Sequence, residues 1–191
     1  MATTEPIRDS RHVRELAGYY FRQGQMRNYC LIVLGIHTAL RIGDLLNLRW
    51  DEVYDFELRR VRECVAVSEA KTGKTKIIAL CKSAVRALSL HAAEAARRGG
   101  FVIENPRTGK PISRVQAYRL VRDAAEAVRL QGRVSCHSLR KTFGYHAWKS
   151  GISPAVIMEI YNHSSFAVTR RYLGVTQDDK NEAYLSLDFS A

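Results

Sequence analysis

The stretch RNYCLIVLGIHTAL, which spans Arg27–Leu40, carries apolar side chains at most of its positions. An apolar run of this length without strict alternation is typical of a helix that is buried on most of its faces. We therefore expect a central buried helix over Arg27–Leu40, with the rest of the chain packed around it.

Further helices are predicted on both sides of this segment from capping residues, glycine stops and apolar spacing. They span Ser10–Arg22, Gly43–Leu48, Ser83–Arg97, Ser113–Leu130, His137–Lys149, Pro154–Tyr161, Phe166–Tyr172 and an amphipathic Asp178–Phe189. Val61–Val67 is rich in strand-forming residues, Lys76–Leu80 is apolar, and the turn residues between them indicate a β-hairpin. The sequence predicts a mainly α fold with a small antiparallel β-sheet, an α+β class. We expect one domain over residues 1–175 and a tail over residues 176–191.

The balance of charge is the first indication of function. Among the 191 residues, 30 Lys and Arg against 19 Asp and Glu give a formal net charge of +11, which favours a polyanionic partner. No apolar run reaches the roughly 18–20 residues that span a bilayer, and the polar start with Glu5 does not resemble a secretory signal. We expect a cytoplasmic protein that binds no membrane.

The four cysteines are irregularly spaced and form no Cys-x-x-Cys pair; they are Cys30, Cys64, Cys81 and Cys136. Cys136 adjoins His137, which raises a nucleophile or a metal ligand as an alternative. No second pair of ligand residues surrounds it, so a reduced structural thiol explains it better. We expect neither a metal site nor a cofactor.

Arg41 ends the apolar run, and Asp44 follows three residues later. A guanidinium cannot lose its charge, so a partly buried one needs a carboxylate or a phosphate as its partner. On these residues alone, a structural Arg41–Asp44 ion pair and a functional site explain the pattern equally well.

Lys71 lies in the turn of the predicted hairpin, with Lys74 and Lys76 nearby. A lysine on a two-stranded ribbon can reach a DNA groove, and its ammonium can protonate a leaving alkoxide. Taken alone, an ordinary solvated turn lysine is the commoner explanation.

His137 and Arg140 are three residues apart at the start of a predicted helix, so they share one face. A phosphate placed there would meet an imidazole, a guanidinium and free backbone N–H groups together. A capping histidine and an exposed arginine remain the alternative, because a lone His-x-x-Arg is a weak signal.

His163 precedes Tyr172 by nine residues, with a turn and part of a helix between them. A tyrosine hydroxyl, with an ordinary pKa of about 10, attacks at neutral pH only beside cations and a base. The chain has nine tyrosines, so Tyr172 alone reads as an ordinary helical residue.

Together and in this order, these residues resemble the catalytic set of the tyrosine recombinase (phage integrase) family. The blocks that carry the resemblance are TALRIGD at 38–44, CHSLRKTF at 136–143, IYNHSS at 160–165 and TRRY at 169–172. They are similar to the family's T-G-L-R-x-x-E, H-x-L-R-H/K-[ST]-F, L-G-H-[SK]-S and T-x-x-Y patterns. The resemblance covers the chain from about Ser10 to Tyr172.

The resemblance implies a catalytic-domain fold and a strand-exchange reaction on double-stranded DNA without cofactor or metal. Arg41 and Arg140 would clamp the scissile phosphate, and Tyr172 would attack it to give a 3′-phosphotyrosyl intermediate. Lys71 would protonate the leaving oxygen. The remaining implied roles are His137 as base, His163 as a phosphate hydrogen-bond donor, and Asp44 as a residue that orients Arg41 or His137. Further DNA contacts are predicted at Lys74, Lys76, Arg114, Lys141, Arg170 and Arg171.

Three positions depart from the family pattern: Ala39 and Asn162 stand where the family usually has glycine, and Asp44 stands in place of glutamate, which shortens its reach by one methylene. Asn tolerates a left-handed turn best after glycine, so Asn162 need not distort the site. Only about 40 residues precede Arg41, and we expect no N-terminal core-binding domain among them. The chain is either a fragment or a short member of the family.

The resemblance also implies a homotetramer on DNA, with accessory DNA-bending proteins as further candidate partners. In the tail, Tyr184, Leu185, Leu187 and Phe189 form an apolar set that suits packing on a neighbouring protomer or on the same chain. Two other functions stay open at this point. They are DNA relaxation by a type IB topoisomerase-like enzyme and regulation by a DNA-binding protein that does not cleave.

Overall fold

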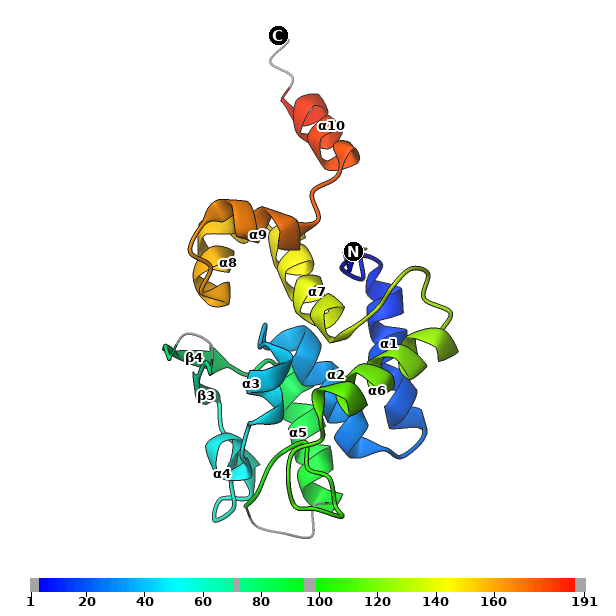
Figure 1. The fold of residues 1–191 in the computed structure, drawn as a ribbon. Helices are drawn as coiled ribbons and strands as arrows, with labels where there is room; N and C mark the ends of the chain where they lie inside the picture. The colour runs from blue at the N-terminus through cyan, green and yellow to red at the C-terminus, as the bar shows by residue number, and fades with distance from the viewer. Residues whose placement is uncertain (1–3, 71–72, 95–98, 188–191) are drawn as a thin grey trace.

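The computed structural model describes residues 4–70, 73–94 and 99–187 (Figure 1). The helices are α1 Ser10–Arg22, α2 Met26–His37, α3 Ile42–Leu46, α4 Trp50–Val53, α5 Lys82–Glu94, α6 Arg114–Ala127, α7 Cys136–Lys149, α8 Pro154–Tyr161, α9 Phe166–Leu173 and α10 Gln177–Ser186. The strands are β1 Tyr54–Asp55, β2 Arg60–Val61, β3 Cys64–Ser68 and β4 Thr75–Ala79. A mainly helical fold with small antiparallel sheets confirms the predicted class.

Helix α2 forms the centre of the larger core, as its apolar sequence predicts. Every residue from 28 to 36 is buried, and α1, α5 and α7 pack against this helix. Figure 1 shows α2 surrounded by these helices and by α6. Burial on all faces explains why the sequence here shows no polar stripe.

The strands form two separate hairpins, β1–β2 and β3–β4, both antiparallel. One continuous strand over Val61–Val67 was expected, but the strand is interrupted: β2 ends at Val61, and β3 begins at Cys64. In β3 the residues alternate between exposed and buried, with Val65 and Val67 facing the core. This alternation sets the direction of the residue that follows the strand, Glu69.

A second, smaller core joins α7, α8 and α9. Its buried members are Ala39, Ile157, Tyr161 and Leu173, and Tyr172 packs against them. The N-terminal segment lies along α7, where the Ile7 N–H donates to Thr142 Oγ1 at 2.9 Å.

Helix α10 extends away from the rest of the chain (Figure 1). Lys149 of α7 contacts its first two turns through ion pairs to Asp179 at 2.9 Å and Glu182 at 3.1 Å. Its far end exposes Tyr184, Leu185 and Leu187. In the described part of the chain, no helix is both long and apolar enough to cross a membrane.

Candidate active site

Arg41 caps the N-terminus of α3 and points toward the end of β3. Its Nη1 lies 2.6 Å from Glu69 Oε2, and 27% of the Arg41 side chain is exposed. The partner of this arginine is therefore Glu69 rather than Asp44, which the sequence offered as the alternative structural partner.

Asp44 is buried in α3, and its Oδ1 accepts a hydrogen bond from the Ala70 N–H at 3.0 Å. This contact differs from the predicted one, in which Asp44 orients Arg41 or His137. Because Ala70 directly precedes Lys71, the contact fixes the chain at the start of the hairpin turn. Lys71 itself lies outside the described residues.

Arg140 is almost completely buried, with 2% of its surface exposed. Its Nη1 donates to the Ala39 carbonyl, and its Nη2 donates to the Tyr161 carbonyl at 3.0 Å. The guanidinium carbon also lies 4.6 Å from the centre of the Tyr161 ring. Two main-chain oxygens thus hold a cation at the junction of the two cores.

The two positions that replace family glycines both have left-handed backbones. Ala39 has φ 55° and Asn162 has φ 52°. At Asn162 this conformation ends α8 and starts the turn that carries His163. A left-handed residue is needed at both places, which explains why glycine suits them.

His137, His163 and Tyr172 meet in one aromatic cluster. The Tyr172 ring centre lies 5.0 Å from that of His137 and 4.6 Å from that of His163. Arg140 is close as well, with its guanidinium carbon 5.9 Å from the Tyr172 ring centre. Nδ1 of His163 lies 3.0 Å from Thr169 Oγ1, one turn before Tyr172 on α9. The structure thus brings four of the predicted catalytic residues together.

Both imidazoles are held in the neutral form. Burial lowers the pKa of His163 to about 4, and the charges of Arg140 and Arg41 act in the same direction. Burial also lowers the pKa of His137, assisted by the charges of Lys141 and Arg140. A neutral imidazole has one N–H that can donate a hydrogen bond and one nitrogen that can accept a proton, so near pH 7 each histidine can serve as a donor or as an acceptor.

Two lysines predicted to contact DNA turn inward instead. The Lys76 ammonium lies 3.2 Å from Glu69 Oε1 and donates to the Ile160 carbonyl at 3.3 Å. The Lys141 ammonium donates to the Thr4 carbonyl at 2.6 Å, and its residue is 4% exposed. Both ammonium groups are engaged inside the protein, and contact of these two lysines with DNA stays a prediction.

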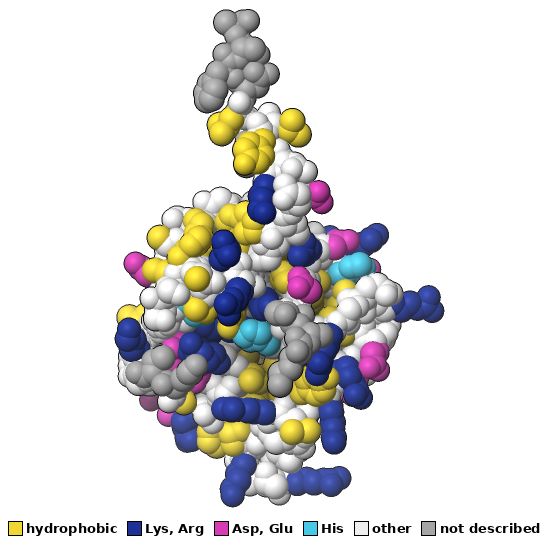
Figure 2. Space-filling view, turned by 45° about the horizontal axis from the view of Figure 1, so that its top comes forward, with side chains coloured by type: hydrophobic (Ala, Val, Ile, Leu, Met, Phe, Trp, Pro, Cys, Tyr) yellow, Lys and Arg dark blue, Asp and Glu magenta, His cyan; other side chains and the backbone are white. Residues whose placement is uncertain are grey.

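The remaining predicted DNA contacts are surface residues: Lys74, Arg114, Arg170 and Arg171 are all exposed. Figure 2 shows more Lys and Arg than Asp and Glu side chains across this view of the molecule. An excess of cations on the surface suits a phosphate backbone.

Two residues at the site were not predicted from the sequence. Glu69 is one of them. The alternating pattern of β3 could have indicated it, because the alternation turns Glu69 toward the interior, where a carboxylate needs a partner. Tyr161 is the other. Its hydroxyl donates to the Arg140 carbonyl at 2.7 Å, and its ring stacks on that of His163 with 5.0 Å between the ring centres.

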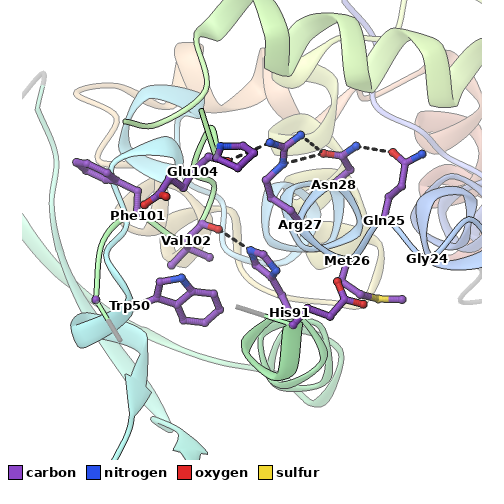
Figure 3. Close-up of a pocket in the computed structure, with 13 residues that line it drawn as sticks. Gly24, Gln25, Met26, Arg27, Asn28, Trp50, His91, Phe101, Val102 and Glu104 are labelled. Carbon is purple, nitrogen blue, oxygen red and sulfur yellow. Dashed lines mark hydrogen bonds between the residues drawn. The ribbon is translucent and has the colours of Figure 1, made fainter. Parts of the chain in front are cut away.

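A separate hollow of about 620 Å³ lies among α2, α4, α5 and the loop after residue 99 (Figure 3). Its main polar groups bond to one another: Arg27 donates to Asn28 Oδ1 and to the Glu104 carbonyl, and His91 Nε2 lies 2.8 Å from the Val102 oxygen. These bonds hold the loop against the helices. Within the described ranges, no group of three His, Cys, Asp or Glu is arranged to hold a metal ion.

Comparison with known proteins agrees with this geometry. Residues 10–179 match the phage integrase family. A probable integrase/recombinase of Bacillus subtilis, YoeC, is 34% identical over 184 residues, covering 96% of this chain and 97% of its own length. Tyrosine recombinase XerD of Mycobacterium leprae is 30% identical, covering 83% of this chain, which spans about half (51%) of XerD.

The fold is also similar to those of solved structures. The XerA recombinase superposes with a TM-score of 0.80 at 20% identity, covering 100% of this chain and 68% of XerA. The XerH recombinase has a TM-score of 0.75 at 15% identity, covering 92% of this chain and 51% of XerH. With a family match over most of its length, this chain belongs to the phage integrase family and is a tyrosine recombinase, an enzyme that breaks and rejoins DNA.

Proposed function

We propose that the chain recombines double-stranded DNA at specific sites with Tyr172 as its nucleophile. The observation that carries the proposal is the convergence of Tyr172 with His137, His163 and Arg140 in one chain. Because these residues come from a single protomer, each copy can assemble its own cleavage site.

In the proposed reaction, the Tyr172 oxygen attacks phosphorus as His137 accepts the hydroxyl proton. A bond forms between Tyr172 and the 3′-phosphate, and the bond from phosphorus to the 5′-oxygen breaks. The leaving 5′-oxygen takes a proton from Lys71, a role that rests on the family resemblance. A second 5′-hydroxyl then reverses these steps on the new partner strand, so the linkage is conserved without ATP.

Arg41 and Arg140 supply the positive charge for the transition state. Each guanidinium carries five N–H donors, so the contacts described above leave donors for the non-bridging oxygens of a phosphate. His163 donates a further hydrogen bond to the phosphate. Fixed cations in a largely buried site stabilise developing charge strongly, because they need no reorganisation during the reaction.

Double-stranded DNA is the proposed substrate. The net charge of +11 and the exposed Arg170 and Arg171 beside the nucleophile support it. Solved XerH complexes hold difH DNA, and a λ integrase dimer holds a core site. We also propose that the enzyme works in the cytoplasm, where the DNA is.

The tail over residues 176–191 is proposed to dock on a neighbouring copy in a tetramer on DNA. Tyr184 and Leu185 of α10 are 79% and 82% exposed, and neighbouring exposed apolar side chains of this kind suit an interface. The ion pairs of Lys149 tether the start of α10 and leave its apolar end free to reach another protomer.

Covalent capture tests the cleavage step without knowledge of the target. Nicked genomic fragments from the source organism are incubated with the protein, denatured in detergent, and recovered with the attached polypeptide for sequencing. We expect a recurring sequence joined to wild-type protein and none joined to Tyr172→Phe. An adduct that persists in Tyr172→Phe would exclude this nucleophile.

Two assays separate recombination from topoisomerase activity, one on the recovered site and one on a supercoiled plasmid. Exchange between two copies of the site supports recombination, whereas relaxation of any supercoiled plasmid without exchange supports topoisomerase activity. For the tail, Leu185→Asp should preserve adduct formation on one site and abolish exchange between sites. Unchanged exchange in Leu185→Asp would contradict docking through α10.

A further inference from the structure

Glu69 is a carboxylate buried at the meeting point of four chain segments. It follows β3 on the inward side, directly after Val65 and Val67 in the alternation, and its side chain is fully buried. Burying an ionised carboxylate costs several kcal/mol unless cations and hydrogen bonds compensate. A group placed at that cost next to Arg41 calls for an explanation beyond packing.

Cations surround this carboxylate on two sides. Arg41 Nη1 lies 2.6 Å from one oxygen, and the Lys76 ammonium lies 3.2 Å from the other. Burial opposes ionisation, but the nearby Arg41 guanidinium, the Asn162 amide and the charge of Lys76 lower the pKa of Glu69 to about 2. Glu69 is therefore charged near neutral pH.

These contacts connect the parts of the site that must act together. Arg41 comes from the start of α3, Lys76 from β4, and Asn162 from the turn that carries His163. Lys76 continues the connection to α8 through the Ile160 carbonyl. Through Arg41 and Lys76, Glu69 thus connects the β3–β4 hairpin to the start of α3 and to the end of α8, which the His163 turn follows.

The two arginines of the site are held by different means. Both terminal nitrogens of the buried Arg140 donate hydrogen bonds to main-chain oxygens. Arg41 is partly exposed and forms an ion pair with Glu69. We propose that Glu69 is a positioning residue for DNA cleavage, holding the Arg41 guanidinium in the orientation in which it receives the scissile phosphate. This inference rests on the proposed function of Arg41.

Glu69→Gln should lower the rate of cleavage without weakening the affinity for DNA. The substitution keeps the size of the side chain and removes one negative charge, so DNA binds as well as before or more tightly. The single-turnover cleavage rate at saturating DNA should fall about 10- to 100-fold, because Arg41 loses its alignment. A general loss of structure would instead weaken both quantities.

A double-mutant cycle shows whether Glu69 acts through Arg41. In the Arg41→Ala background, Glu69→Gln should cause no further loss of rate, since the group that it positions is gone. Losses that multiply would mean that Glu69 acts elsewhere and would overturn the proposal. So would a Glu69→Gln rate equal to or above that of the wild type, the result expected if Glu69 were a brake that neutralises Arg41.

Matched variants control for charge and for folding. Glu126→Gln removes an exposed carboxylate that pairs with Arg122 at 3.3 Å on α6, and it should leave the cleavage rate unchanged. If Glu69→Gln does not fold, Glu69→Asp keeps the charge and withdraws it by one methylene. A wild-type rate in Glu69→Asp would then count against positioning.

One measurement needs no DNA and separates this inference from the proposed function. In NMR spectra of the free protein, the Nε–H signal of Arg41, assigned by its loss in Arg41→Lys, should be sharp and slow to exchange. In Glu69→Gln the Arg41 Nε–H signal should broaden, exchange faster and overlap with the signals of mobile arginines. An unchanged signal would overturn the role of Glu69, whereas absence of any adduct from the wild type would count against the proposed reaction alone.

Discussion

The rings of Tyr172 and His163 lie 4.6 Å apart between their centres, although the two residues belong to different segments, α9 and the turn after α8. The contact requires the left-handed backbone at Asn162, because that residue ends α8 and redirects the chain.

The stability of the protein should decrease as the pH is lowered, because His163 binds a proton more readily in the unfolded chain. Its pKa is about 4 in the folded protein and about 6.5 when unfolded, so the unfolded chain binds the proton first. The contribution of His163 to stability is therefore complete above about pH 6.5, decreases as the pH falls to about 4, and changes no further below that. Thermal melting of the wild type and His163→Gln between pH 4 and 8 measures it.

The difference in melting temperature between these two proteins should shrink toward low pH. His12→Gln on α1, outside the cluster, provides the matched control. A difference that stays constant across the range would mean that His163 does not couple protonation to folding.

Two substitutions at Asn162 separate its backbone from its amide. Asn162→Gly keeps the left-handed turn at no steric cost, whereas Asn162→Ala introduces strain of about 1 kcal/mol. Chemical denaturation should show that difference in the free energy of unfolding. Because both variants lack the amide that helps to lower the pKa of Glu69, their cleavage rates should fall to a similar extent. Equal stability of the two variants would contradict the backbone argument.

Gly144 of α7 makes room for the Tyr161 hydroxyl. A Cβ at position 144 would overlap that oxygen and the edge of the ring. Gly144→Ala should destabilise the protein by about 1–3 kcal/mol, since neither the helix nor the buried ring can shift freely. Denaturant titration measures the loss.

Gly18→Ala in α1 is the matched control, because its Cβ would meet only the flexible end of Arg22. Alanine is the better helix former, so we expect a gain of about 0.5–1 kcal/mol there. If Gly144→Ala were as stable as Gly18→Ala, the close approach of Tyr161 would be wrong.

Lys149→Gln should loosen α10 and leave the body of the protein unaffected. Its ion pairs with Asp179 and Glu182 link α7 to that helix, and ion pairs of a solvent-exposed lysine add little to global stability. We expect faster amide exchange over Gln177–Ser186 with an unchanged melting temperature. Lys180→Gln, within α10 itself, should not accelerate exchange to the same degree.

The sequence predicted the helical architecture well where a single local signal was strong. The apolar run from Arg27, the Ser113 cap and the Pro154 start all gave helices close to those observed. The broken strand at 61–67 was missed, because the β1–β2 pairing depends on contacts that propensity does not encode. The class of enzyme came from the order of several weak motifs.

The site was predicted as a set of residues but not as a set of contacts. Arg41 was expected to face Asp44 or a phosphate, and its observed partner Glu69 lies 28 positions along the chain from it. The contact of Lys76 with Glu69 could not be predicted either. The direction of the Lys76 side chain depends on the register of the strand, and only the pairing of β3 with β4 fixes that register. Spacing identifies which residues share a helix face, while ion pairs between segments require the fold.

The carbonyls of Ala39 and Tyr161 that hold Arg140 carry a consequence for protein engineering. No exchange of a neighbouring side chain can remove these acceptors directly, so the placement of Arg140 tolerates sequence drift around it. A designer who wishes to graft this centre onto another scaffold cannot do so by copying side chains. The two bends of the main chain, at 39 and at 161–162, must be transplanted with it.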